Sequence, residues 1–294
     1  MKTLNLTDLE KSDIKYKINN YPDGQSNITI ESLSCSLHEG SAQIPLKDLY
    51  GGVEIKSRLN NFKDLELVIC ATKSLRSLGI KDISLYTPYF LGSRSDRKFE
   101  IGGNNYLKDV ICPIINSLEF SSVITMDPHS YVLEACLNNF KTEDIRDFYK
   151  LAHINLNLDS NNTIIVCPDA GAQKRAQVAA KQMGINDIIT CSKERDSNGK
   201  LNKFVVPNIQ RFGNKDFVIV DDICDGGGTF NNIGYDVRLQ QAGTGMAGKR
   251  YLIITHGIFS KGLGELQQYF DGIYTTNSYQ DLQVEPFVKQ FKII

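Results

Sequence analysis

The chain has 294 residues, of which 41% are hydrophobic and 23% are charged, and its formal net charge is -1. This length suits one large or two medium domains, and the composition is that of an ordinary globular protein. The balanced charge argues against a nucleic-acid coat or a polybasic membrane binder, and no apolar run approaches the roughly 20 residues that span a bilayer. We therefore expect no nucleic-acid partner and no membrane partner.

The cysteines indicate a reducing compartment. Seven are scattered along the chain without a Cys-x-x-Cys pair, and residues 1–13 lack the apolar core of a signal peptide. An odd, dispersed set argues against a disulfide scaffold and against a cysteine-ligated zinc. We expect a cytoplasmic protein with reduced thiols.

Five apolar, β-rich runs each end in a polar or glycine-containing loop, and helical patterns lie between several of them. Their apolar residues are contiguous, as in strands that are buried on both faces of a parallel sheet. The helical patterns at 172–184 and 229–243 end at Gly184 and Gly243, where a helix cap is expected. This order predicts a doubly wound α/β fold. The five runs are 83–90, 122–130, 163–171, 217–228 and 251–259.

The runs also suggest an internal duplication. The pair at 83–90 and 122–130 is echoed by the pair at 163–171 and 217–228, because the later strand of each pair ends in an acidic loop. We therefore predict two related α/β domains, with a boundary in the polar stretch 138–150.

The segment 218–230 carries the strongest chemical signal. Adjacent carboxylates at a strand end suit a sugar diol or a metal-bound hydroxyl, because a carboxylate only accepts hydrogen bonds. Glycines at the start of a helix let backbone N–H groups face a phosphate. A plain strand-to-helix turn with solvated carboxylates is the alternative. The predicted sugar-phosphate residues are Asp221, Asp222, Asp225, Gly226, Gly227, Gly228 and Thr229.

Three further loops carry candidate residues. His129, beside Asp127, and Asp169 each follow an apolar run, and together they could form part of a Mg²⁺ shell at nucleotide phosphates. Lys193 and Arg195 lie in a polar stretch, where two cations could stabilise a phosphoryl-transfer transition state. A structural histidine and a solvated charged loop are the alternatives.

Residues 218–230 resemble the phosphoribosyl-pyrophosphate loop that phosphoribosyltransferases share with ribose-phosphate diphosphokinases. Six other segments resemble the diphosphokinase family in particular, and they occur in that family's order. This collinearity is more specific than any single motif. The segments are YPDGQ (21–25), PYFLGSRSDRK (88–98), MDPHS (126–130), CPDAGAQKRA (167–176), SKERD (192–196) and THGIFSKG (255–262).

The resemblance implies two doubly wound phosphoribosyltransferase-like domains with mostly parallel sheets. We expect the nucleotide-side domain at 1–142, joined by the tail 278–294, and the sugar-phosphate domain at 143–277. It also implies that His129 and Asp169 hold one Mg²⁺ of the nucleotide. In the family the first of these segments comes from a neighbouring subunit, which implies a homo-oligomer (dimer or hexamer). The implied ATP-binding residues are Tyr21, Asp23, Gln25, Arg94, Ser95 and Asp96.

The implied reaction is Mg²⁺-dependent transfer of the β,γ-diphosphoryl group of ATP to the C1 hydroxyl of ribose 5-phosphate. The products are phosphoribosyl pyrophosphate and AMP. The predicted catalytic residues are Lys193 and Arg195, which would neutralise charge on the transferred group.

The chain departs from the family pattern in three places. Ser95 and Gln25 replace a glutamine and a glutamate near the nucleotide, and segment 99–110 lacks the arginines that imply an allosteric phosphate site. Gly226 replaces the threonine of Asp-Thr-Gly-Gly-Thr, which we expect to leave the phosphate pocket roomier.

Three alternatives remain at this point. The roomier pocket permits ADP-ribose as the acceptor, with the same chemistry at C1. A phosphoribosyltransferase would share only residues 218–230. A catalytically silent, regulatory relative is disfavoured, because such proteins typically lose the catalytic-loop cations or metal ligands, which are present here.

Overall fold

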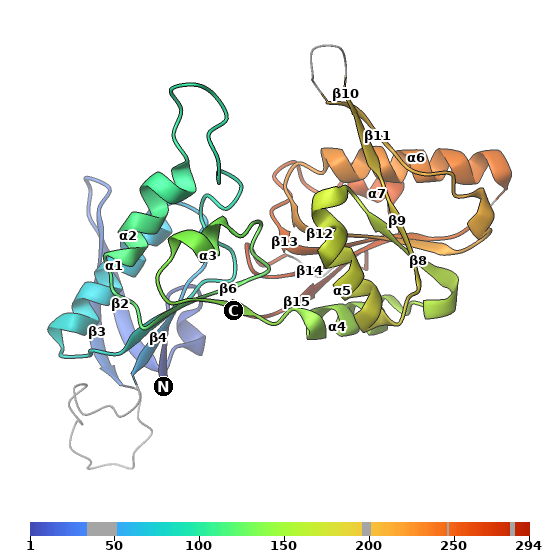
Figure 1. The fold of residues 1–294 in the computed structure, drawn as a ribbon. Helices are drawn as coiled ribbons and strands as arrows, with labels where there is room; N and C mark the ends of the chain where they lie inside the picture. Colours follow the sequence, from blue (N-terminus) through green and yellow to red (C-terminus); the bar gives the residue numbers. More distant parts are fainter. Residues whose placement is uncertain (34–51, 196–200, 246, 283–285) are drawn as a thin grey trace, which may run out of the picture. The chain divides into compact units, whose positions relative to one another are not determined.

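The computed structural model describes residues 1–33, 52–195, 201–245, 247–282 and 286–294, with the backbone alone at 32–33, 193–195 and 201–204. The chain divides into two compact units, Met1–Glu143 with Ile294 and Asp144–Ile293. Each contains a parallel sheet with helices (Figure 1), which confirms the predicted fold class of two doubly wound α/β domains. In the described part of the chain, no helix is long and apolar enough to cross a membrane.

The first unit contains a five-stranded parallel sheet in the order β1-β4-β5-β6-β7. An antiparallel hairpin of β2 and β3 accompanies it. Helix α1 begins with a capping box, in which Asn61 and Asp64 each accept a hydrogen bond from the other's backbone N–H. The elements are β1 Lys2–Asn5, β2 Ile14–Asn20, β3 Ser26–Leu33, β4 Val53–Lys56, α1 Phe62–Ser77, β5 Ile83–Tyr86, α2 Cys112–Asn116, β6 Ser122–Met126, α3 Val132–Cys136 and β7 Phe140–Glu143.

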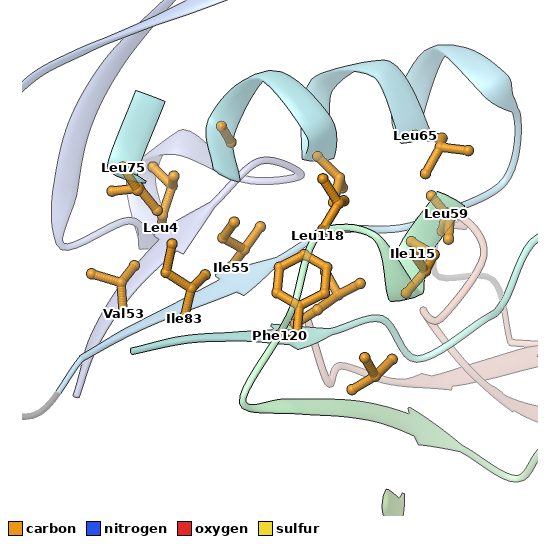
Figure 2. Close-up of a cluster of buried hydrophobic side chains, with 14 of the residues drawn as sticks. Leu4, Val53, Ile55, Leu59, Leu65, Leu75, Ile83, Ile115, Leu118 and Phe120 are labelled. Atoms are coloured by element: carbon orange, nitrogen blue, oxygen red, sulfur yellow. The ribbon is translucent and has the colours of Figure 1, made fainter. Parts of the chain in front are cut away.

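The core of the first unit lies between its sheet and its helices. Strand residues Val53, Ile55 and Ile83 face α1 residues Leu65 and Leu75 (Figure 2), and all five side chains are fully buried. This burial stabilises the unit, because each apolar side chain removed from water contributes about 1.5–3 kcal/mol.

The second unit contains a six-stranded parallel sheet in the order β15-β14-β13-β12-β8-β9. An antiparallel ribbon of β10 and β11 follows β9 along the chain. Figure 1 shows α4 and α6 on opposite sides of this sheet. The elements are α4 Arg146–Leu156, β8 Thr163–Cys167, α5 Gln173–Met183, β9 Asp187–Thr190, β10 Ser192–Arg195, β11 Leu201–Val205, β12 Asp216–Cys224, α6 Gly228–Thr244, β13 Arg250–Gly257, α7 Leu266–Tyr269, β14 Gly272–Thr276 and β15 Val288–Phe291.

Two details differ from the sequence-based predictions. The tail 278–294 does not join the first unit as expected: β15 pairs with β14 in the second sheet, and only Ile294 groups with the first unit. Helix α5 ends at Gly184 as predicted, with φ +67°, but α6 continues past Gly243. Its left-handed cap is Gly245, with φ +70°, so the second of two nearby glycines ends the helix.

Candidate active site

The acidic, glycine-rich segment forms a tight connection from β12 to α6. The strand ends at Cys224, and the helix begins at Gly228. Gly227 precedes the helix with φ +77°, a left-handed conformation that glycine adopts without steric cost. At Gly228 the position of an added Cβ has no described atom within 4 Å. The start of α6 therefore offers a backbone surface that an anion can approach closely.

Two of the three predicted carboxylates lie beside a cation that sequence analysis did not select. Arg175 of α5 places Nη1 3.3 Å from Oδ1 of Asp221 and 3.7 Å from Oδ1 of Asp222. The backbone N–H of Asp222 donates to Oδ1 of Asp221 at 3.0 Å. Arg175 could have been identified from its position in the segment 167–176, which matches the family pattern.

This pair of carboxylates has an altered acidity. Burial raises the pKa of Asp221 well above its usual range, and the charge of Asp222 raises it further, while Arg175 lowers it. One guanidinium therefore compensates the pair only partly. A ligand that donates hydrogen bonds or carries positive charge, such as a ribose diol or a metal ion, would stabilise both ionised carboxylates.

The turn after β13 is hydrogen-bonded to the end of β12, where the connection to α6 begins. The carbonyl oxygen of Cys224 accepts hydrogen bonds from the N–H groups of Ile258 and Phe259, at 2.9 and 3.1 Å. The side chain of Lys261 lies against Gly226, because Cδ and Cε are 3.4 Å from the position of an added Cβ. The stem of Lys261 therefore lies within ordinary van der Waals distance of a side chain at residue 226.

Asp169 lies on a strand next to the sugar-phosphate connection. It follows β8, which pairs with β12, and its side chain accepts a hydrogen bond from the N–H of Ala172 at 3.2 Å. The ligand-bearing ends of neighbouring parallel strands meet at one sheet edge, so Asp169 and Asp221 belong to the same edge.

The predicted catalytic cations lie on the ribbon of the second unit. Lys193 and Arg195 are in β10, paired with Phe204 and Leu201 of β11. The ribbon begins immediately after Cys191, whose N–H donates to the carbonyl of Cys167 at 2.9 Å. Its backbone thus starts at the edge that carries Asp169. The side chains of Lys193 and Arg195 lie outside the described residues.

The predicted nucleotide residues of the first unit follow two neighbouring strands. Arg94, Ser95 and Asp96 come after β5, and the exposed His129 comes after β6. Hydrogen bonds connect the segment after β5 to β6. The carbonyl of Pro88, which follows β5, accepts from Thr125 Oγ1 at 3.0 Å and from the N–H of Met126 at 3.2 Å.

The remaining nucleotide residues form the tip of the β2–β3 hairpin. Gln25 Nε2 donates to Oδ2 of Asp23 at 3.0 Å, and the N–H of Tyr21 donates to the carbonyl of Gln25 at 2.9 Å. Tyr21 is 50% exposed, so its ring is available to a base or to a second protein chain.

The predicted site residues therefore fall into two sets. The ATP-binding residues and His129 belong to the first unit, whereas Asp169, the cations and the sugar-phosphate residues belong to the second. Within the described residues, no group of three or more His, Cys, Asp or Glu side chains is arranged as a metal site. The second unit does bring together Asp221, Asp222 and the glycine-rich start of α6.

Comparisons with known proteins show what this chain is similar to. Residues 145–235 match the family described as "Phosphoribosyl transferase domain". Ribose-phosphate pyrophosphokinase from Mycoplasmopsis pulmonis is 29% identical over 239 residues, which cover 80% of this chain and 70% of that protein. The enzyme of the same name from Saccharolobus solfataricus is 30% identical over 168 residues, covering 56% of this chain and 55% of that protein.

A third relative and a solved structure agree with these matches. The ribose-phosphate pyrophosphokinase of Agrobacterium fabrum is 29% identical over 208 residues, and the match spans 61% of its length. Two of these three relatives are therefore matched over less than two thirds of their length. Phosphoribosylpyrophosphate synthetase from Mycobacterium smegmatis shares the fold, with a TM-score of 0.77 and 14% identity over 97% of this chain and 88% of that chain. In sequence the chain is therefore similar to ribose-phosphate pyrophosphokinases, as a divergent relative, and in fold it is similar to a phosphoribosylpyrophosphate synthetase.

Proposed function

We propose that the protein transfers the β,γ-diphosphoryl group of ATP to the C1 hydroxyl of ribose 5-phosphate. The C1 oxygen forms a bond to the β-phosphorus, the bond from that phosphorus to the α,β-bridging oxygen breaks, and AMP leaves. The hydroxyl proton passes to solvent. The observation that carries this proposal is the combination of Asp221, Asp222 and the open glycine start of α6 on one connection.

In this proposal the ribose diol donates hydrogen bonds to Asp221 and Asp222. The sugar phosphate lies against the N–H groups of residues 225–229, where the helix dipole favours an anion. Lys193 and Arg195 neutralise charge on the transferred group. No protein nucleophile is needed, because positioning and electrostatic stabilisation do most of the work in phosphoryl transfer.

ATP would contact the residues of the first unit. We propose that Arg94, Ser95 and Asp96 bind its phosphates and ribose, and that the exposed hairpin tip with Tyr21 and Asp23 binds adenine in a neighbouring subunit. This arrangement would require a homo-oligomer, either a dimer or a hexamer. We also propose a cytoplasmic location, in which ATP is available and the cysteines stay reduced.

A magnesium ion fits the donor atoms of the site. The carboxylate oxygens of Asp169 are hard ligands of the kind that Mg²⁺ prefers, and one of them already accepts the N–H of Ala172, which fixes its orientation. We propose that Asp169 and His129 hold this ion. When bound, it would neutralise the negative charge of the ATP phosphates.

A second acceptor is favoured by one observation. Gly226 lacks the hydroxyl of the family's threonine, so the connection makes one contact fewer to a terminal phosphate monoester. ADP-ribose, in which that phosphate is part of a diphosphate, would react at the same C1 hydroxyl. The lost hydrogen bond to a charged group contributes only about 1.5–3 kcal/mol, so ribose 5-phosphate stays first.

An acceptor panel tests the proposal. Purified protein is incubated with ATP and Mg²⁺ and with ribose 5-phosphate, ADP-ribose or no acceptor, and AMP is measured by chromatography. Acceptor-dependent AMP release supports a diphosphokinase, and the better acceptor has the higher kcat/KM. Asp221→Asn should abolish this release, whereas Asp147→Asn, which neutralises an exposed carboxylate of α4, should not. No AMP release with either acceptor would point to a silent regulatory protein.

A further inference from the structure

Lys261 lies directly beside the sugar-phosphate connection. Its Cδ and Cε atoms are 3.4 Å, and its Cγ atom 3.6 Å, from the place where a Cβ at residue 226 would lie. A Cβ at residue 226 would therefore make ordinary van der Waals contact with the lysine stem. Residue 226 and Lys261 are direct neighbours.

The turn that carries Lys261 is fixed by the strand that carries the carboxylates. Two N–H groups of the turn, from Ile258 and Phe259, donate to the carbonyl of Cys224, which directly precedes Asp225. Phe259 adopts φ +47°, an uncommon conformation for a bulky residue, and buries its ring in the core of the second unit. The buried ring holds this strained turn in place.

A further hydrogen bond closes the turn around Lys261. The N–H of Gly262 donates to the carbonyl of Phe259 at 2.8 Å, and Gly262 has φ +71°. At Gly257 an added Cβ would lie 2.2 Å from the Phe259 ring, so only glycine fits there. The backbone of Lys261 is thus held by contacts on both sides, while its ammonium group is exposed to solvent.

The connection from β12 to α6 is surrounded by negative charge, which a nearby cation would offset. Asp221, Asp222 and Asp225 are all acidic, and Arg175 contacts the first two from α5. A phosphorylated sugar brings further negative charge. Among the described residues, no hydrogen bond or ion pair holds the ammonium of Lys261, so it can turn toward an anion at the start of α6.

We propose that Lys261 binds the phosphate of the acceptor and replaces the hydroxyl donor that is missing at residue 226. This inference rests on the proposed function, because it assigns a further contact in the same sugar-phosphate site. An ammonium on a flexible stem is a point charge with rotatable donors, so it binds a monoester and a diphosphate alike. Lys261 would therefore broaden the range of phosphorylated acceptors rather than narrow it.

A matched set of variants tests the role of the charge. Lys261→Met keeps most of the stem and removes the charge, and Lys181→Met makes the same change on the exposed face of α5. We expect Lys261→Met to weaken binding of ribose 5-phosphate or ADP-ribose, measured by calorimetry, by about 10-fold or more. The KM of the acceptor should rise by a similar factor while kcat changes less than about 2-fold, and Lys261→Arg should restore most of the affinity.

Gly226→Thr tests the pairing of the two residues. In the Lys261→Ala background it should recover affinity by supplying the hydroxyl, whereas alone it should gain little, because Lys261 already supplies a donor. Additive effects of the two substitutions would overturn the pairing.

The outcomes separate this inference from the proposed function. Wild-type binding or turnover with an unchanged Lys261→Met variant would overturn the role of Lys261 alone. Binding of the phosphorylated sugar that depends on Lys261, without AMP release, would support the contact and overturn the diphosphokinase proposal. Absence of sugar-phosphate binding by the wild type would overturn both.

Discussion

Arg175 and Asp221 lie within 3.3 Å of each other, although they come from a helix and from a strand that are separated along the chain. Both side chains are largely buried, with exposed fractions of 15% and 20%. The guanidinium also lies 3.7 Å from Asp222, so one cation serves two carboxylates. This shared contact links α5 to the C-terminal part of β12. It leads to a prediction for Arg175 and a prediction for Asp221.

Replacement of Arg175 by methionine should destabilise the protein. Loss of the guanidinium removes the cation that contacts two adjacent carboxylates in a largely buried place, which typically costs about 3 kcal/mol. Urea unfolding followed by circular dichroism measures the change, with Lys181→Met on the same helix as the control. An unchanged free energy of unfolding would mean that Arg175 does not stabilise the folded protein through these two carboxylates.

Asp221→Asn should change the pH dependence of stability. The raised pKa of Asp221 means that the native protein binds a proton that the unfolded chain, with an ordinary pKa near about 4, has already released. The free energy of unfolding therefore falls as pH rises from about 4 through the raised pKa. The variant should lose this slope and be more stable than wild type at neutral pH. Unfolding midpoints across pH 4–8 check this, and an unaltered slope would assign it to another group.

The two glycines at the start of α6 should respond differently to alanine. Gly227→Ala forces φ +77° on a residue with a Cβ, which costs about 1–2 kcal/mol. Gly228→Ala meets no described atom within 4 Å and should leave stability within about 0.5 kcal/mol of wild type. If the sugar phosphate binds at the start of α6 as proposed, the added methyl group should also weaken acceptor binding. Thermal unfolding and calorimetry separate these effects, and full affinity in Gly228→Ala would place the phosphate elsewhere.

Lys193→Ala should reduce kcat by about 100-fold or more with little effect on stability. A cation that neutralises charge in the transition state contributes to turnover rather than to folding. Steady-state AMP release measures the loss, and Lys181→Ala provides a lysine control in the same unit. A rate like that of wild type would remove Lys193 from the mechanism.

The buried thiols should be inert in the native protein. Burial raises the pKa of Cys112 and of Cys191 to about 12, so neither forms the reactive thiolate at pH 8. Among the described cysteines, iodoacetamide should label the partly exposed Cys70 and Cys136 before these two, which should stay unmodified until the chain is unfolded. Peptide mass spectrometry after timed labelling gives the order, and early modification of Cys191 would indicate local opening of the second unit.

The sequence predicted the second unit better than the first. Strand β8 is buried along its whole length and β13 along all but its first residue, so contiguous apolar residues identified both as strands of a parallel sheet. The hairpin of β2 and β3 was missed, although Ile14, Tyr16 and Ile18 alternate with polar residues in β2. That period-two pattern was the signal that could have identified it.

The candidate site could be predicted in part for a similar reason. Asp221 and the glycines are adjacent in sequence, so one motif names them. Arg175 and Lys261 reach the same place only through the pairing of β12 with its neighbouring strands, which composition and spacing do not reveal. The position of β15 beside β14 likewise depends on a pairing between distant segments, which the expected domain assignment of the tail did not anticipate.

The late position of β15 in the chain has a consequence for biosynthesis. Until residues 288–291 leave the ribosome, β14 has one bare edge and cannot form its pairs with that strand. β14 is entirely apolar or β-branched apart from its first residue, and such an uncovered edge is a template for association with other chains. Nascent chains that stall before this point should therefore be prone to aggregation and should depend on chaperones more than the finished protein does.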